Sequence, residues 1–74
     1  MGRMMVDQLT PRQKEVAELI SEHFSDRQIA ARLGISYWTT RSHVKQIFQK
    51  LGVKRREQLW GGGWRTADGE NDGR

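Results

Sequence analysis

The 74 residues of the sequence include no cysteine, no long hydrophobic run and only one proline. Without cysteine, the chain can form neither a disulfide bond nor a thiolate metal site. No apolar stretch approaches the roughly 20 residues of a membrane-spanning helix, and the N-terminus lacks the hydrophobic region of a signal peptide. We therefore expect a cytoplasmic protein with no membrane partner.

Side chains that could carry catalysis or hold a metal are also scarce. The two histidines, His23 and His43, lie twenty positions apart with no thiol partner, and this spacing fits no common zinc site. No nucleophile–base pair, pair of catalytic acids or phosphate-binding loop is visible. We therefore expect no metal, no cofactor and no enzymatic activity.

Acidic residues are absent from one segment in particular. The net charge is only +4, but residues 41–56 carry six bases and no acid, whereas bases and acids balance over residues 1–33. The six bases are Arg41, Lys45, Lys50, Lys54, Arg55 and Arg56. Positive charge concentrated in this way favours a face that binds a polyanion.

Capping signals predict where the first two helices begin. Thr10 with Gln13, and Ser25 with Gln28, have the spacing of capping boxes, in which each side chain bonds to the other residue's backbone N–H. Apolar residues then recur at helical spacing, so we expect helices at about 11–22 and 26–33. Gly34 is placed to end the second helix in a left-handed conformation.

The third helix, expected at about 37–51, has two different faces. The face expected to be buried carries Thr40, Val44, Ile47 and Leu51. The opposite face carries Trp38, Ser42, Lys45 and Gln49, with Arg41 and Gln46 on its flanks.

Gly52 closes the third helix, and a short fourth helix at about 55–60 ends at Gly61–Gly63. The sequence thus predicts an all-α bundle of three to four helices over residues 9–60. We expect residues 1–8 to be flexible and the glycine-rich tail, residues 61–74, to be disordered.

A short helix, a glycine turn and a longer helix form a helix-turn-helix, whose second helix can enter the DNA major groove. Base contacts are expected from the outer face of that helix, at Trp38, Arg41, Ser42, Lys45 and Gln49. Contacts with the DNA backbone are expected from Ser36, Gln46, Lys54 and Arg55.

Several segments, in order, resemble the LuxR/GerE-type DNA-binding domain of bacterial regulators. They are Leu9–Val16, Ser25–Ala30, Leu33–Ser36, the single residues Thr39, Arg41 and His43, and Lys50–Val53. The resemblance covers about residues 9–60 and implies four helices, with the third in the major groove and the fourth commonly used for dimerisation. It also implies DNA contacts at Arg41, Ser42 and Lys45, with Thr39 near the phosphates.

The chain departs from this family pattern at three places. Thr40 stands where the family usually has a buried valine, and its hydroxyl needs a partner, for which the carbonyl one turn earlier is a candidate. Tyr37 and Trp38 replace a polar pair. The fourth helix is cut short by three glycines, which puts dimerisation through it in doubt. The sequence also shows no receiver or ligand-sensing domain, so we expect either a stand-alone regulator or an excised C-terminal domain.

The aromatic residues leave alternatives open. Trp38 either packs against the turn after the second helix or projects from the DNA-facing side. Trp60 and Trp64 either close the core, which we favour for Trp60, or join Leu59 in a surface for a dimer or another partner. His43 is expected to be a packed, hydrogen-bonded residue. Arg56 is expected to pair with an acid on the first helix such as Glu15.

The sequence therefore predicts sequence-specific binding of double-stranded DNA in transcription regulation, with a homodimer on DNA as one arrangement. Two alternatives remain. One is a protein-interaction module that docks on another regulator through Trp60 and Trp64. The other is a promoter binder similar to region four of a sigma factor, whose partner is RNA polymerase.

Overall fold

The computed structural model describes residues 9–66, and over this range it contains only helices. They are α1 (Pro11–Ser21), α2 (Asp26–Leu33), α3 (Tyr37–Leu51) and the 3₁₀ segment η2 (Arg56–Thr66). The prediction of an all-α domain is confirmed. The prediction of a flexible N-terminus at 1–8 lies outside the described residues, as do residues 67–74 of the tail predicted to be disordered at 61–74.

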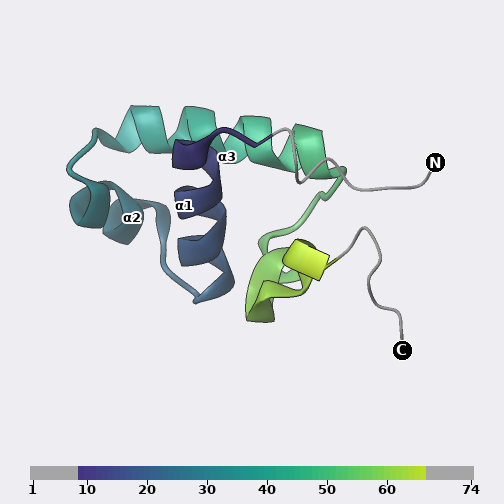
Figure 1. Cartoon of the computed structure of the whole chain (residues 1–74). Helices are drawn as coiled ribbons and strands as arrows, with labels where there is room; N and C mark the ends of the chain where they lie inside the picture. Colours follow the sequence, from purple (N-terminus) through teal and green to yellow (C-terminus); the bar gives the residue numbers. More distant parts are fainter. Residues whose placement is uncertain (1–8, 67–74) are drawn as a thin grey trace.

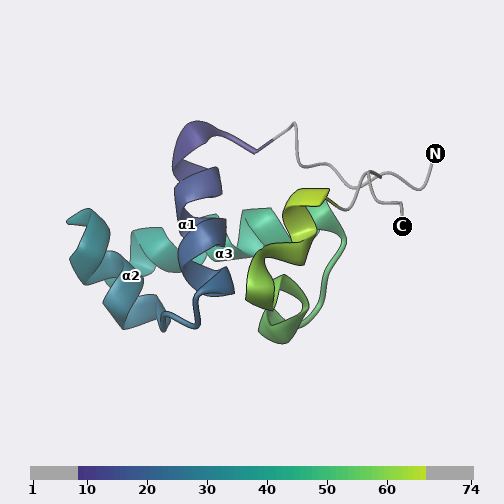
Figure 2. The same ribbon diagram turned by 60° about the horizontal axis from the view of Figure 1, so that its bottom comes forward.

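The helices surround α1. In Figures 1 and 2, α1 lies between α2 on one side and η2 on the other, while α3 runs across all three. Helix α1 packs against each of the other elements, and α2 packs against α3. The pair α2–α3 therefore rests on a scaffold made by α1 and η2.

Local hydrogen bonds confirm the predicted helix starts. Both capping boxes are present, because the side chains of Thr10 and Ser25 accept from the backbone N–H of Gln13 and Gln28, whose side chains bond back. Ser36 caps α3 by accepting from the backbone N–H of Thr39 at 2.9 Å. Each contact satisfies an N–H that has no partner within its helix.

Left-handed residues end the three α-helices. Gly34 and Gly52, both at φ 69°, cap α2 and α3, as the sequence predicted. After α1 the left-handed residue is His23, at φ 72°. The backbone N–H groups of His23 and Phe24 donate to the carbonyls of Ile20 and Leu19, which completes a Schellman motif without glycine.

One hydrophobic core joins all four elements. It draws on both ends of the described chain, from Leu9 before α1 to Trp64 in η2. The fully buried large residues are Val16, Ile20, Ile29, Thr40, Ile47 and Leu59. The buried face predicted for α3 is confirmed, since Thr40, Val44, Ile47 and Leu51 are all buried. Its opposite face is thereby turned to solvent.

The fourth segment differs from the short helix predicted at 55–60. It is a 3₁₀ segment interrupted at Trp60, Gly61 and Gly62, whose backbone angles are not helical. Gly61 and Gly62 have φ of 79° and 76°, a conformation that glycine adopts without strain. The chain turns back at these two glycines and continues to Trp64, which packs in the core. The glycines therefore do not end the folded part of the chain.

The reversal places Trp64, and not Trp60, in the core. Trp64 is 3% exposed and belongs to the core, whereas Trp60 is 45% exposed. The preference for Trp60 as a core residue was therefore wrong. The indole of Trp60 instead stacks on the imidazole of His23, with ring centroids 4.3 Å apart. The domain extends at least to Trp64, beyond the boundary predicted at residue 60.

Candidate nucleic-acid interface

The outer face of α3 forms a continuous, open surface. A hollow of about 560 Å³ lies along it, lined by Trp38, Arg41, Ser42, Val44, Lys45, Phe48, Gln49 and Arg56. All five residues expected to contact bases line this hollow and are exposed. The helix therefore brings together the residues that the sequence selected, and Arg56 joins them from η2.

Trp38 projects into solvent from the first turn of α3. It is 76% exposed, so the alternative in which it packs against the turn after α2 was wrong. Its neighbour Tyr37 is held instead, because the guanidinium of Arg27 lies 4.9 Å from the centre of the Tyr37 ring. The rings of Tyr37 and Trp38 meet edge to face, with their centroids 5.0 Å apart. This contact restrains the exposed indole of Trp38.

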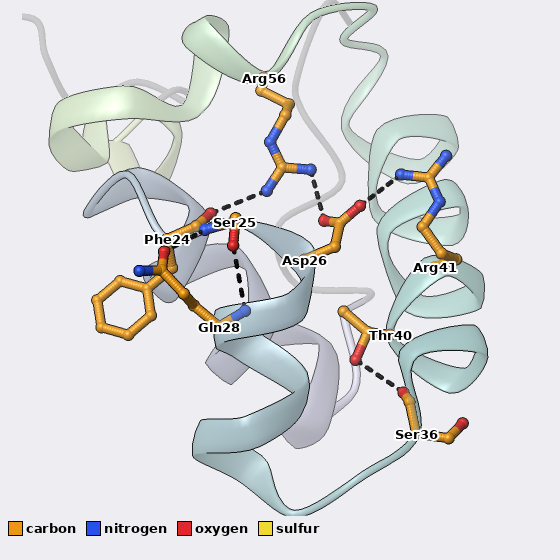
Figure 3. Close-up of polar contacts among 8 residues, drawn as sticks. All are labelled: Phe24, Ser25, Asp26, Gln28, Ser36, Thr40, Arg41 and Arg56. Atoms are coloured by element: carbon orange, nitrogen blue, oxygen red, sulfur yellow. Dashed lines mark hydrogen bonds and ion pairs between the residues drawn. The ribbon is translucent and has the colours of Figure 1, made fainter.

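Asp26 connects three elements by bonding to two arginines. Its Oδ2 accepts from Nη1 of Arg41 on α3, and its Oδ1 accepts from Nη1 of Arg56 on η2, both at 2.7 Å. Arg56 also donates through Nη2 to the backbone carbonyl of Phe24 at 3.0 Å. Figure 3 shows the carboxylate of Asp26 between the two guanidinium groups.

The predicted partner of Arg56 was therefore wrong: it is Asp26 on α2, and not an acid on α1. Glu15 instead pairs with Arg12 within α1, at 3.0 Å. Arg56 lies at the start of η2, where the packing of η2 brings its side chain to the N-terminus of α2. Its role is to tie η2 to α2.

The pKa of Asp26 reflects these contacts. Partial burial of the carboxyl raises the pKa, but the hydrogen bonds from Arg41 and Arg56 and their charges outweigh it, so the pKa lies below its ordinary value. The hydrogen bond to Asp26 in turn raises the pKa of Arg41. Asp26 is therefore a carboxylate at neutral pH, and the three side chains together carry one net positive charge.

Lys45, one turn beyond Arg41, is the contrasting case. Its side chain is exposed in the same hollow. Within residues 9–66 it makes no ion pair, whereas Arg41 is bonded to Asp26. Of the two cations that α3 places in the hollow, Arg41 is therefore restrained and Lys45 is not.

The residues expected to contact the DNA backbone lie at both ends of α3. Ser36 and Thr39 are exposed at its start, where the hydroxyl of Ser36 donates to that of Thr39 at 2.9 Å. Lys54 and Arg55 are exposed beyond its end. Their backbone N–H groups both donate to Oε1 of Gln58, at 2.7 and 2.9 Å, which fixes the backbone that carries them.

Gln46 lies on a different side of α3 from the hollow. Its Oε1 accepts from Nε2 of Gln13 at 2.7 Å, and Oε1 of Gln13 accepts from Nζ of Lys50 at 3.0 Å. This network ties the middle and end of α3 to the first turn of α1. A backbone contact by Gln46 stays a prediction, and Gln46 already has a structural partner.

The predicted partner surface is reduced to a single exposed residue. Leu59 is fully buried and Trp64 nearly so, so neither can form a surface for a dimer or another partner. Both side chains pack in the core that joins η2 to α1 and α3. Trp60 is the member of the predicted set that remains accessible.

His43 is half-buried, as expected of a packed residue. Among residues 9–66, its Nδ1 is buried and has no hydrogen-bond partner, so the expected hydrogen bond is not found at that atom. In the same part of the chain, no three histidine, cysteine or carboxylate side chains come together as a metal site. None of the helices described is both long and apolar enough to cross a membrane.

Sequence reasoning missed Asp26. Nothing in its immediate sequence distinguishes Asp26, because its partners are fifteen and thirty residues away. The available signal was an acid at the first position of α2 in a chain with an acid-free segment at 41–56. That signal identifies candidate partners without selecting Arg41 and Arg56 among six bases.

Known bacterial proteins, two of them named as regulators, are similar in sequence to this chain. The spore germination protein GerE of Bacillus subtilis is 46% identical over 50 residues, which cover 68% of each chain. The nitrate/nitrite response regulator protein NarL of Escherichia coli is 39% identical over 51 residues, or 69% of this chain and 24% of NarL. An HTH-type transcriptional regulator of Mycobacterium tuberculosis is 41% identical over 51 residues, covering 69% of this chain and 6% of its own length.

The chain thus spans most of GerE but only a small part of the longer relatives. The family model described as bacterial regulatory proteins, luxR family, matches residues 7–60, a range that contains α1, α2, α3 and the beginning of η2. The chain therefore belongs to the luxR family of bacterial regulatory proteins.

Proposed function

We propose that this chain binds double-stranded DNA with sequence preference in transcription regulation, with the outer face of α3 in the major groove. Membership of the luxR family supports DNA binding, because its helix-turn-helix domains bind double-stranded DNA. The protein acts in this proposal as a binding module and not as an enzyme, in the cytoplasm.

The observation that carries the proposal is the division of α3 into two faces. Thr40, Val44, Ile47 and Leu51 anchor one face in the core, and the other presents an exposed row of donors along one hollow. An α-helix fits the major groove of B-form DNA, whose base edges offer hydrogen-bond acceptors and thymine methyl groups. The row on α3 matches this chemistry.

The exposed residues divide by what they can recognise. Arg41 and Lys45 can donate to O6 and N7 of guanine, and Gln49 can bond to an adenine edge. Trp38 can contact a thymine methyl group or the sugar wall of the groove. Ser42 is short and lets the helix backbone approach the bases.

A second set of residues would contact the phosphates on either side of the groove. Ser36 and Thr39 lie at the N-terminus of α3, where the helix dipole favours an anion. Lys54 and Arg55 lie beyond the other end of α3. Contacts of this kind fix the register of the helix without reading sequence.

Selection of bound duplexes from a random library tests the proposal. The expected result is a recurring motif of a few base pairs. A motif with two-fold symmetry would support a homodimer on DNA, with half-sites about one helical turn apart. Recovery of duplexes with no shared motif would contradict the proposal.

The exposed indole of Trp60 supports a second candidate. It is stacked on His23 at the surface where α1 ends and η2 turns. In this alternative the chain docks on another regulator or on RNA polymerase through Trp60. Loss of that partner in Trp60→Ala, with DNA affinity unchanged, would support it. Retention of the partner by that variant would count against it.

A further inference from the structure

We propose that Asp26 is a positioning residue that sets the guanidinium of Arg41 for reading guanine. The inference rests on the proposed function, since it concerns how one base-contacting side chain is presented to DNA. Asp26 itself contacts no base in this account and acts through Arg41.

The geometry of the pair restrains Arg41 before DNA binds. An exposed arginine samples many rotamers, and ordering it on binding costs free energy. The side chain of Arg41 is 49% exposed, yet its Nη1 lies 2.7 Å from Oδ2 of Asp26. The free protein therefore already restrains the guanidinium that must enter the groove.

Asp26 is itself held in place by a second arginine. Its side chain is 13% exposed, and its other oxygen accepts from Nη1 of Arg56 at 2.7 Å. Arg56 is in turn anchored to the carbonyl of Phe24 at 3.0 Å. A carboxylate bound on both oxygens is a fixed acceptor, so it defines the position of Arg41 instead of following it.

The guanidinium of Arg41 keeps N–H donors that Asp26 does not use. A guanidinium has five N–H donors, and a bidentate bond to O6 and N7 of guanine uses two of them. The bond to Asp26 involves Nη1 alone among the nitrogens of Arg41. In Figure 3 the other terminal nitrogen of Arg41 points away from Asp26, so donors remain for a base.

The positive charges around Asp26 allow its carboxylate to lie beside DNA. An isolated carboxylate there would repel phosphates, but Asp26 is neutralised by Arg41 and further compensated by Arg56. The opposite role for this pair is sequestration, in which Asp26 withdraws Arg41 from DNA. The two roles predict opposite effects on base discrimination when the carboxylate is removed.

The experiment measures binding to the selected duplex and to the same duplex with each guanine replaced in turn. The guanine whose replacement no longer matters in Arg41→Ala is the base that Arg41 reads. For Asp26→Asn we expect discrimination at that guanine to fall roughly 3- to 10-fold, the cost of ordering one long side chain. Affinity for random DNA should stay the same or rise, because one negative charge is removed.

Two controls separate positioning from charge and from folding. Glu15→Gln removes the carboxylate from the exposed ion pair between Arg12 and Glu15 on α1. It should change discrimination at that guanine by less than about 2-fold. Asp26→Glu keeps the charge and moves the carboxylate by one methylene. It should keep the fold by circular dichroism and still lose discrimination at the same guanine. In Arg41→Ala, adding Asp26→Asn should cause no further loss at that base.

Three results would overturn the inference while leaving the proposed function standing. One is a selected motif in which Arg41→Ala alters no guanine preference. Another is discrimination that Asp26→Asn and Asp26→Glu leave unchanged. The third is discrimination that increases in Asp26→Asn, which would establish sequestration. Failure of the proposed function is a different result, namely a wild-type protein with no preferred duplex.

Discussion

The side-chain hydroxyl of Thr40 donates a hydrogen bond of 3.1 Å to the carbonyl oxygen of Ser36, the residue that caps α3 one turn earlier. The same carbonyl accepts the backbone N–H of Thr40 at 3.0 Å. The fully buried hydroxyl is thereby satisfied inside its own helix. The candidate partner that the sequence suggested for this hydroxyl is confirmed.

Replacing Thr40 with valine should stabilise the domain. The methyl group fills the same space, and the carbonyl of Ser36 keeps its backbone hydrogen bond. We expect the free energy of unfolding in urea to rise by about 0.5–1 kcal/mol, since a buried hydroxyl is exchanged for an apolar group. Thr39→Val is the control: it removes a hydroxyl of the same helix whose contact with Ser36 is exposed, and should change the free energy of unfolding by no more than about 0.5 kcal/mol. A loss above about 1 kcal/mol in Thr40→Val would show that the hydroxyl itself stabilises α3.

The two tryptophans of η2 should differ sharply in their effect on stability. Trp64→Ala empties a core position and should cost about 3–5 kcal/mol, which approaches the whole stability of a domain this small. Trp60→Ala removes a half-exposed ring and should cost about 1 kcal/mol or less. Thermal unfolding followed by circular dichroism measures both. Equal losses in the two variants would contradict the burial of Trp64.

Asp26 should make stability depend on acid pH. Its folded pKa lies below the unfolded value, so its contribution is complete above the unfolded pKa of about 4 and is lost as pH falls through the folded pKa. We expect the stability difference between wild type and Asp26→Asn to be constant from about pH 5 to 7 and to shrink below about pH 4. Urea unfolding at each pH measures this difference. A difference that stays constant down to about pH 2 would show that the ionised carboxylate contributes nothing.

Phosphate contacts should appear as salt dependence. If about 4–6 phosphates are neutralised, the logarithm of the binding constant should fall with the logarithm of salt concentration with a slope of roughly −4 to −5. Arg55→Ala should reduce that slope by about one and weaken all duplexes alike. Lys14→Ala, on the exposed side of α1, is the matched control. An unchanged slope in Arg55→Ala would remove Arg55 from the interface.

Local signals in the sequence were sufficient for most of the fold. Thr10, Ser25 and Ser36 start their helices through bonds to residues three positions away. Gly34 and Gly52 end theirs by adopting a conformation that few other residues reach easily. Such contacts depend on neighbours in the chain, so spacing alone predicts them.

The features that the sequence could not predict depend on contacts between residues far apart in the chain. Gly61 and Gly62 break a helix wherever they occur, but whether the chain then leaves or returns is decided by the core space that Trp64 fills. Likewise, Asp26 meets Arg41 and Arg56 only because three elements pack together. The exposed face of α3 was predictable, whereas the restraint on Arg41 was not.

The most direct test of the central claim compares Lys45→Ala with Lys14→Ala for discrimination between the selected duplex and random DNA. Lys45 is exposed in the hollow of α3 and has no ion-pair partner within residues 9–66, so its removal should leave the fold intact. Fluorescence anisotropy should show a loss of about 1–3 kcal/mol for the selected duplex in Lys45→Ala and a much smaller loss for random DNA. Lys14→Ala should match the wild type on both. Equal affinity of Lys45→Ala and wild type for the selected duplex would contradict DNA reading by the outer face of α3.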